Sequence, residues 1–403
     1  MYEFSSRISK VLKTASQLDS SEVRPDTLGA IAHGVLRLSN IFTRDNSGVR
    51  ANYLEEPKLR QAYLAYYVPV NLAKVQQLLA ELQPVLAVHK EPEFRVLDVG
   101  GGPGTAALAL LDWACSTSTP PPDTIRMAVM DRSPAVLTVC AELWQSYLNE
   151  IREYRVLPLR TIKCNLERMS PVQAAPGVSG PGYHLIVLQN VLSELYHGIP
   201  DASDKRAALV ADLLSMVTQD GSLMLIEPAL RTTSRSLHEL RDKLLASSQC
   251  SVYSPCLHDK NCPALVGLDD WCHEERSWRR PGWIEQIDES VGFIKDALKF
   301  SYVVFRKDGK ALVPRSQPYH RVVSELRVMK GERRVWLCDA AGRSEVGRQD
   351  KDCSPSNAAF ENYHRGAIVK ISEIVRKERK GRLSTVGRIL PQGTAEVIRP
   401  AEG

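Results

Sequence analysis

The stretch VLDVGGGPGTAALAL (residues 96–110) decides the fold of this chain. It begins with a run of aliphatic and β-branched residues, which favours a buried strand. Four glycines then allow a sharp turn, because glycine adopts backbone conformations that other residues avoid. The alanines and leucines that follow favour a helix. The sequence therefore predicts a strand, a glycine-rich turn and a helix in direct succession.

Further strand-forming runs follow this unit, separated by segments with helical patterns. They occupy residues 124–133, 160–166, 183–195, 221–230 and 300–307. Strands that alternate with helices indicate a mostly parallel sheet with helices on both faces. The residues before 91 read as helices, and Pro69 marks a break or kink in the helical pattern of residues 59–82. After residue 310 short strands separated by turns predict a small β-barrel or sandwich.

The glycine turn is compatible with three kinds of site. A phosphate-binding loop needs a Lys-Ser/Thr pair after the glycines, and a dinucleotide fingerprint needs a further glycine, and this chain has neither. The remaining pattern, Asp98-x-Gly100-x-Gly102-x-Gly104, resembles motif I of class I S-adenosylmethionine (SAM) methyltransferases. The alternative is a tight turn in a fold that binds no ligand.

Polar residues at later strand ends extend this expectation. Asp131 ends the second strand, where a carboxylate can accept hydrogen bonds from a ribose diol. Asn165, after the third strand, is a candidate for the adenine edge, and Gln189 lies at the carboxyl end of the fourth, where such folds bind ligands. The predicted cofactor-binding residues are thus Asp98, Gly100, Gly102, Gly104, Asp131, Asn165 and Gln189.

Four of the nine cysteines lie within 23 residues, in CSVYSPCLHDKNCPALVGLDDWC. They are Cys250, Cys256, Cys262 and Cys272, and this density indicates metal ligation. Structural zinc prefers cysteine pairs separated by two to four residues, which are absent here, whereas an iron–sulfur cluster needs thiolates spread more widely. His258 and His273 are possible alternative ligands. Zinc remains the alternative to iron.

Charge is unevenly distributed along the chain. Residues 301–403 carry 21 Lys and Arg against 12 Asp and Glu, whereas the whole chain has a formal net charge of only +5. A basic module of this kind suggests a polyanionic partner such as RNA. The candidate contacts are Arg327, Lys330, Arg333, Arg334, Arg376, Lys377, Arg379, Lys380 and Arg382.

Taken together, these stretches resemble the methyltransferase-like assembly factors of the small ribosomal subunit, which occur in mitochondria and many bacteria. The resemblance rests on AYLAYYVPVNLAKVQQLL, VLDVGGGPGTAALAL, NVLSEL, LIEPAL, SPCLHDKNCP and WCHEE. It implies a [4Fe–4S] cluster on Cys250, Cys256, Cys262 and Cys272, and an OB-like C-terminal region. It also implies the small subunit and its rRNA as partners.

Two functions are compatible with these features. One is a SAM-dependent rRNA methyltransferase with a structural cluster, and the other is a non-catalytic factor that binds rRNA and uses the same fold as a scaffold. The loop Asn/Asp-Pro-Pro-aromatic, common in enzymes that methylate amino groups of nucleic acids, is replaced here by Gln189-Asn190-Val191-Leu192. Asn190 is the candidate for orienting a base, and no other catalytic residue is identified.

The expected organisation has three parts: a helical region (residues 1–90), a methyltransferase-like domain (91–310) with a cysteine-rich insertion (231–297), and a basic β-rich domain (311–403). No stretch is apolar for the roughly 20 residues that span a bilayer, and the N-terminal residues lack the apolar core of a secretory signal. We therefore expect a cytoplasmic protein, or a mitochondrial matrix protein in a eukaryote, that is monomeric off the ribosome and has no membrane partner.

Overall fold

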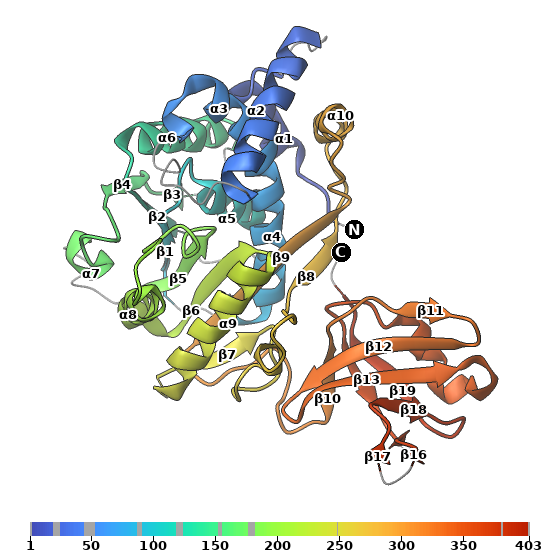
Figure 1. Cartoon of the computed structure of the whole chain (residues 1–403). Coiled ribbons are helices and arrows are strands. Elements are labelled where there is room, and N and C mark those ends of the chain that lie inside the picture. Colours follow the sequence, from blue (N-terminus) through green and yellow to red (C-terminus); the bar gives the residue numbers. More distant parts are fainter. Residues whose placement is uncertain are drawn as a thin grey trace. The chain divides into compact units, whose positions relative to one another are not determined.

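The computed structural model describes residues 2–18, 25–43, 53–86, 91–117, 124–151, 155–175, 182–247, 249–379 and 382–401. The chain forms two compact units (Figure 1). Unit 1 comprises residues 1–223 and 277–298, and unit 2 comprises residues 224–276 and 299–403. The boundary falls within three strands, β6 (Val217–Pro228), β8 (Glu274–Ser277) and β9 (Ala297–Arg306), whose residues are therefore divided between the units.

Unit 1 is built around parallel strands. β1 (Glu93–Val99) lies between β2 (Thr124–Asp131) and β5 (Tyr183–Gln189), and both pairings are parallel. β3 (Arg155–Val156) and β4 (Arg160–Lys163) pair with β2 in the same direction. Strand order in the complete sheet is β3-β2-β1-β5-β6-β9-β7, in which the last pair, β9 and β7 (Ser251–Ser254), is antiparallel.

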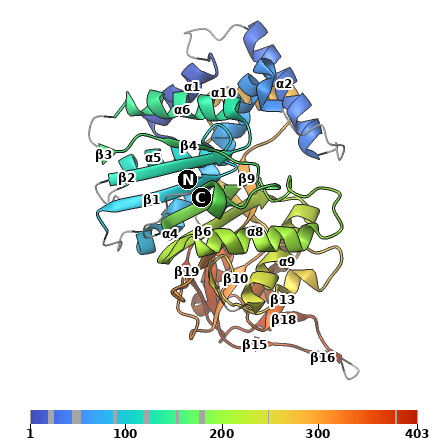
Figure 2. The same ribbon diagram turned by 90° about the vertical axis from the view of Figure 1, so that its left-hand side faces the viewer.

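Helices cover both faces of the strands in unit 1. Figure 2 shows α6 (Pro134–Leu148) and α8 (Ala202–Ser215) on opposite sides of β1 and β2. Helix α5 (Thr105–Ser116) packs against α4 (Val68–Leu86), and its apolar residues are almost entirely buried. The remaining α-helices described in unit 1 are α1 (Ser6–Ala15), α2 (Pro25–Thr43), α3 (Pro57–Ala62), α7 (Pro171–Ala174) and α10 (Gly282–Val291). The predicted strand-turn-helix unit and parallel sheet are confirmed.

The predicted irregularity near Pro69 is a π-helical segment, η3 (Tyr63–Tyr67), between α3 and α4. Proline has no N–H to donate to the preceding turn, so the regular ladder of hydrogen bonds cannot continue through it. Single π-helical turns within α-helices are rare and are frequent at functional sites. The helix continues without a sharp break, because Pro69 occupies the first turn of α4.

Unit 2 begins with the end of β6 and α9 (Arg231–Ala246), followed by β7, η4 (Pro263–Leu265) and β8 (Glu274–Ser277), which pairs with β9. Beyond β9 the chain forms a curled sheet with the order β15-β18-β13-β12-β10-β14-β19. Its apolar core includes Val322, Val335, Val346, Phe360 and Ile389. The helical turns η5 (Asp350–Asp352) and η6 (Pro355–Asn362) follow β13.

The strands of the curled sheet are short. They are β10 (Tyr319–Val322), β11 (Arg327–Met329), β12 (Glu332–Asp339), β13 (Gly342–Gln349), β14 (Ile368–Ile371), β15 (Ile374–Val375), β18 (Val386–Ile389) and β19 (Ala395–Arg399). A separate hairpin joins β16 (Glu378–Arg379) to β17 (Arg382–Leu383). The chain thus has the predicted α/β class I methyltransferase-like fold, preceded by helices and followed by a β-rich sheet.

Candidate functional site

The glycine turn joins β1 to α5 through three residues with positive φ. These angles are +64° at Gly100, +54° at Gly102 and +84° at Gly104, a region that favours glycine. The turn is fixed to the neighbouring strand, because Gly100 N–H and Gly101 N–H both donate to the carbonyl oxygen of Met130, at 2.7 and 3.1 Å. The loop is therefore a rigid element at the carboxyl ends of β1 and β2.

The space around each glycine differs. A Cβ at Gly100 would lie 2.5 Å from Val191, one at Gly101 would lie 2.6 Å from Asp98, and one at Gly104 would lie 2.5 Å from Cys140. At Gly102 the nearest atom would be a Leu54 methyl group 4.0 Å away. Gly100, Gly101 and Gly104 are thus required by packing, whereas Gly102 faces open space where a ligand can approach the backbone.

Two carboxylates flank this opening. Asp98 is almost fully buried, and its Oδ2 accepts a 3.3 Å hydrogen bond from Ala107 N–H at the start of α5. Burial raises the pKa of Asp98 to about 7, and the charge of Asp131 acts in the same direction. Burial also raises the pKa of Asp131, although hydrogen bonds from Ser133 N–H and Gly102 N–H oppose this. A cationic ligand would relieve the cost of placing two acids together.

The other predicted cofactor residues have local partners. Asn165 Oδ1 accepts a 3.0 Å hydrogen bond from Glu167 N–H, which closes a turn after β4. Gln189 Nε2 donates to the carbonyl oxygen of Asn71 at 2.9 Å and so connects β5 to α4. Both side chains therefore help to shape the rim of the opening at Gly102, in addition to anything that they contribute to ligand binding.

Asn190 differs from these two residues. Its φ is +58°, an uncommon value for a residue other than glycine. Its Oδ1 atom is buried and accepts no hydrogen bond from the residues that the structure describes. A strained backbone and an unsatisfied polar atom in one residue are more frequent at functional sites than elsewhere.

An aromatic cluster, which the sequence did not identify as part of the site, lies beside the glycine turn. Tyr63 and Tyr67 stack at 5.6 Å between ring centroids, and Phe42 meets Tyr53 and Tyr67 edge to face at 5.2 and 5.1 Å. The charges of Glu194 and Asp131 act on the hydroxyls of Tyr53 and Tyr63, whose pKa values are raised mainly by burial. The clearest sequence signal was the i, i+4 spacing of Tyr63 and Tyr67, which equally indicates a core.

Lys74 is a second unforeseen residue. It lies buried on α4, and its Nζ donates to Asn71 Oδ1 at 3.0 Å. Burial lowers the pKa of Lys74 to about 7, and the charge of Lys295 acts in the same direction. Through Asn71 this lysine is connected to Gln189 at the end of β5.

In unit 2, α9 organises the cysteine segment. Arg241 is fully buried and donates to the carbonyl oxygens of His258 and Lys260 at 2.6 and 2.9 Å. Asp242 Oδ2 accepts a 2.8 Å hydrogen bond from Cys262 N–H, and His238 Nε2 lies 3.2 Å from the carbonyl oxygen of Cys272. One face of a single helix therefore fixes the backbone of the whole segment.

The thiols of this segment lie close to a cysteine from the curled sheet. Burial raises the pKa of Cys262, and the charges of Cys256 and Cys272 act in the same direction. Burial likewise raises the pKa of Cys338 on β12, followed by the charges of Cys272, Cys256 and Cys262. The pKa of Cys272 is raised to about 12 by burial and by Cys256. Four thiols from two distant parts of the sequence thus influence one another.

Cys250 has different neighbours. Burial raises its pKa to about 11, and the acting charges are those of Asp259 and Arg241. His258 Nε2 lies 4.0 Å from Cys338 Sγ, so this histidine lies beside one of the other four thiols. Within the described part of the chain, no three His, Cys, Asp or Glu side chains are arranged to hold a single metal ion.

Several candidate RNA contacts are engaged in internal ion pairs. Arg327 pairs with Glu345, Arg333 with Asp350 and Glu361, and Arg334 with Glu332. Arg376 donates to the carbonyl oxygens of Ser384 and Thr385. Lys330 and Lys377 are exposed, and no ion pair among the described residues includes either of them. Lys380 lies outside the described residues, as do the side chains of Arg379 and Arg382.

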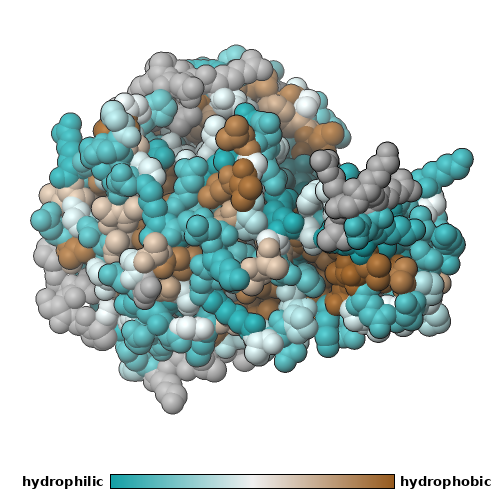
Figure 3. All heavy atoms as spheres, turned by 60° about the horizontal axis from the view of Figure 1, so that its bottom comes forward, coloured by the Kyte–Doolittle hydropathy of each residue, from teal (hydrophilic) through white to brown (hydrophobic). Residues whose placement is uncertain are grey.

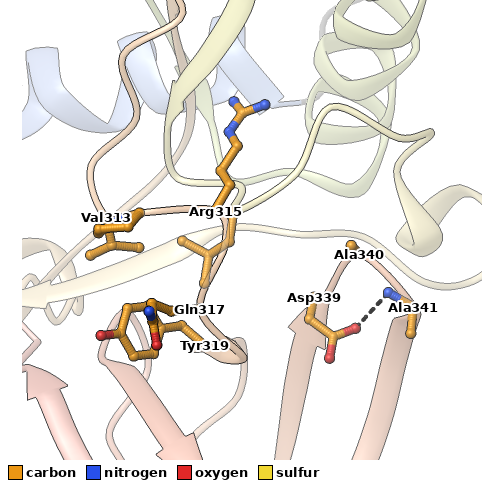
Figure 4. A pocket seen from close by; sticks show the side chains of 9 residues that line it. Val313, Arg315, Gln317, Tyr319, Asp339, Ala340 and Ala341 are labelled. Carbon is orange, nitrogen blue, oxygen red and sulfur yellow. Dashed lines mark hydrogen bonds between the residues drawn. The ribbon is translucent and has the colours of Figure 1, made fainter.

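Unit 2 also contains a small pocket of about 230 Å³ (Figure 4). Val313, Gln317 and Tyr319 line one side of it, and Asp339 and the β12–β13 turn line the other. Asp339 accepts a hydrogen bond from Ala341 N–H and pairs with His320, so its carboxylate is already satisfied. Arg315 points away from the pocket and pairs with Asp259. The pocket therefore offers little free polar chemistry.

Solved structures with a similar arrangement are methyltransferases of low identity. Magnesium protoporphyrin IX methyltransferase from Synechocystis PCC 6803, with bound SAM, is 13% identical at a TM-score of 0.36, covering 65% of this chain and 96% of its own. The plantazolicin methyltransferase BpumL, in complex with SAH, is 9% identical at a TM-score of 0.34, and the match covers 74% of this chain and 99% of BpumL. Ribosomal protein L11 methylase from Lactobacillus delbrueckii subsp. bulgaricus is 14% identical at a TM-score of 0.29, and the match covers 58% of this chain and 79% of the methylase.

No curated protein matches this chain. In the described residues, no helix is both long and apolar enough to cross a membrane. A family model does match, and it covers residues 57–351, from α3 through the turn that follows β13. The matched region includes the glycine turn, the cysteine segment and Cys338. The chain belongs to the Rsm22 family, described as mitochondrial small ribosomal subunit Rsm22.

Proposed function

We propose that this protein is a SAM-binding factor of the small ribosomal subunit that carries an iron–sulfur cluster and contacts rRNA through its basic C-terminal sheet. The observation that carries the SAM-binding part is the opening at Gly102. There a half-buried stretch of glycine backbone lies between the buried carboxylate of Asp98 and the half-buried carboxylate of Asp131. Family membership supports the ribosomal part.

The pocket suits SAM for three reasons. Asp98 would lie near the positively charged methionine end, and the ligand charge would favour the ionised carboxylate. Asp131 is placed to accept hydrogen bonds from a ribose diol, because a carboxylate has more lone pairs than its bonds from Gly102 N–H and Ser133 N–H use. The aromatic side chains of Tyr53 and Tyr63 would exclude water from one side.

For the cluster we propose the ligands Cys256, Cys262, Cys272 and Cys338, in place of the set that contained Cys250. The donor chemistry fits, since buried thiols whose charges influence one another suit a soft, cationic centre. A single zinc ion needs sulfur atoms about 3.8 Å apart, whereas a cluster accepts a wider spread. When bound, the cluster would supply a cross-link between the cysteine segment and β12. Zinc remains the alternative, and metal analysis separates the two.

Methyl transfer to rRNA is the second candidate function. It is favoured by Asn190, whose unsatisfied Oδ1 follows β5 at the edge of the sheet where the cofactor would lie. An amide oxygen there could accept a hydrogen bond from an exocyclic amino group of a base and orient it for transfer. Lys74 lies on the adjacent helix but is not exposed enough to reach a bound base.

The proposal also includes a cellular compartment and an oligomeric state for the protein. The family description names the mitochondrion, so for a eukaryotic source we propose the matrix, and for a bacterial source the cytoplasm. We propose a monomer when it is off the ribosome.

The decisive experiment uses anaerobically purified full-length protein. Calorimetric titration with SAM tests the pocket, and incubation with methyl-labelled SAM and small-subunit assembly intermediates tests transfer. Binding with label in rRNA supports the enzyme, and binding without label supports the factor. Absence of SAM binding would refute the proposed pocket, and Asp98→Ala provides the negative control.

A further inference from the structure

Two aliphatic side chains in the cysteine segment are almost fully exposed. Val266 is 87% exposed and Leu268 is 84% exposed, on either side of Gly267. Figure 3 shows hydrophobic side chains among hydrophilic ones on the face that it draws, as on most proteins. The pair at Val266 and Leu268 differs from such scattered residues, because it is more exposed than every other large hydrophobic residue of the described chain.

The backbone that carries this pair is fixed. The Arg235 guanidinium donates to the carbonyl oxygens of Gly267 and Asp270 at 2.6 and 2.7 Å, and also to those of Ala264 and Leu265 at 3.2 and 3.3 Å. One arginine on α9 thus holds four successive parts of the loop. The loop also starts with a helical turn, in which Leu265 N–H donates to the carbonyl oxygen of Cys262 at 3.1 Å.

Ion pairs secure the end of the same loop. Asp269 pairs with Arg231 at 2.6 Å, and Asp270 pairs with Arg343. A loop held by this many bonds and still presenting two aliphatic side chains to solvent loses little conformational entropy when it binds a partner. A preformed binding surface requires such an arrangement. The stability of the protein itself gives no reason for exposing these two aliphatic side chains.

The chemistry of the loop selects the kind of partner. Aliphatic side chains cannot stack on nucleobases as aromatic ones do. The side chain of Asp269 is 92% exposed beside Leu268 and pairs with Arg231 through Oδ1, which leaves Oδ2 to face a partner, where it disfavours phosphate and favours a cation. A partner protein with an apolar pocket surrounded by basic side chains would bind both features. The pocket would hold the aliphatic pair, and the basic side chains would pair with the carboxylate of Asp269.

We infer that Val266 and Leu268 form a docking knob that inserts into an apolar, basic-rimmed pocket on a protein of the small ribosomal subunit. This inference rests on the association with the small subunit that the proposed function includes. The knob contacts protein, and the basic sheet contacts rRNA, so the two surfaces make separate contributions to binding.

Subunit binding by the full-length chain tests the knob. Val266→Asp/Leu268→Asp is compared with Ile294→Asp, which changes an aliphatic residue in unit 1 that is 75% exposed. Affinity for purified small subunits is measured by co-sedimentation, and iron content confirms that the cysteine segment is intact. We expect the double variant to bind about 30-fold more weakly, as for the loss of a central apolar contact, and Ile294→Asp to bind normally.

A photo-crosslinking residue at position 266 identifies what the loop touches. A crosslink to a subunit protein supports the knob, whereas a crosslink to rRNA, or none above the level obtained at position 294, overturns it. If wild type binds subunits and the double variant binds equally well, the knob is wrong while the proposed function stands. If wild type does not bind subunits at all, the proposed function fails, and the knob fails with it.

Discussion

The main-chain N–H of Gly102 donates a 3.0 Å hydrogen bond to Asp131 Oδ2. This bond joins the glycine turn after β1 to the acid that ends β2, so two motifs separated by 29 residues form one site. Both residues are then held at the edge of the sheet where ligands of such folds bind.

Replacing Gly102 with alanine tests this site. A Cβ there has space, but it would enter the opening and occupy a left-handed conformation that costs roughly 1–2 kcal/mol. We expect SAM affinity to fall at least tenfold. Gly309→Ala is the matched control, because Gly309 also has a positive φ, +73°, with nothing within 4 Å of its added Cβ. Calorimetry should show lost binding only in Gly102→Ala, although both variants lose similar stability. Equal SAM affinity in the two variants would contradict the proposed pocket.

Cys338 and Cys250 distinguish the two ligand sets. We expect Cys338→Ser to lose most of its iron and its visible absorption, as expected for removal of one of four thiolates. Cys250→Ser should retain both, since its charged neighbours are Asp259 and Arg241. Iron and zinc are measured per chain after anaerobic purification. Retained iron in Cys338→Ser together with lost iron in Cys250→Ser would restore the set expected from the sequence.

The fold was predictable because its signals are local. The run from Val96 to Leu110 contains a strand, a turn and a helix, and each shows its own residue preferences. Strand β13 carries no such local signal, because its sequence, GRSEVGRQ, is polar. It is a strand because β12 and β18 pair with it on either side. Pairing with distant segments cannot be read from the strand preferences of its own residues.

The site was predictable only in part, for a related reason. Asp98 and Asp131 follow strands and could be found by position. Cys338 lies 66 residues beyond Cys272 on a strand of the curled sheet, and its sequence context resembles an ordinary buried cysteine. Only the folded chain brings it to the other thiols. The same holds for Lys74, whose burial depends on how α4 packs.

Lys74 predicts a pH dependence of stability. Its pKa is about 7 in the folded protein and near 10.5 when unfolded, so between these values the unfolded chain binds more protons. Its unfavourable contribution is therefore fully present below pH 7 and disappears as the pH rises towards 10.5. Lys74→Met should be more stable than wild type at pH 7, by at most about 5 kcal/mol. The difference should shrink towards pH 10.

Urea unfolding at pH 7, 8.5 and 10 measures this effect. Other groups titrate in the same range, but they do so in both proteins, so the difference isolates Lys74. Lys58→Met, at an exposed position on α3, controls for the loss of a charge and should show no such trend. A stability difference between Lys74→Met and wild type that stays constant with pH would mean that Lys74 remains charged in the folded protein.

The basic sheet is best tested by removing charges. Deleting residues 311–403 would also remove Cys338 and the apolar core of the curled sheet, so lost binding would have several causes. Lys330 and Lys377 are suitable instead, because their exposed ammonium groups are available to phosphate. Each phosphate contact contributes about 0.7–0.9 to the slope of log affinity against log salt. We therefore expect Lys330→Gln/Lys377→Gln to weaken rRNA binding and to reduce that slope by about 1.5.

Filter binding of small-subunit rRNA between 50 and 200 mM salt, a range over which such contacts weaken markedly, provides the measurement. Lys58→Gln/Lys163→Gln removes two exposed charges from unit 1 and should leave the slope unchanged. Arg333→Gln should have a smaller effect than either lysine in the sheet, because its guanidinium already pairs with Asp350 and Glu361 and must exchange those partners for phosphate. If the control pair reduces the slope as much as the test pair, the attraction comes from overall charge, and the curled sheet is not the rRNA-binding surface.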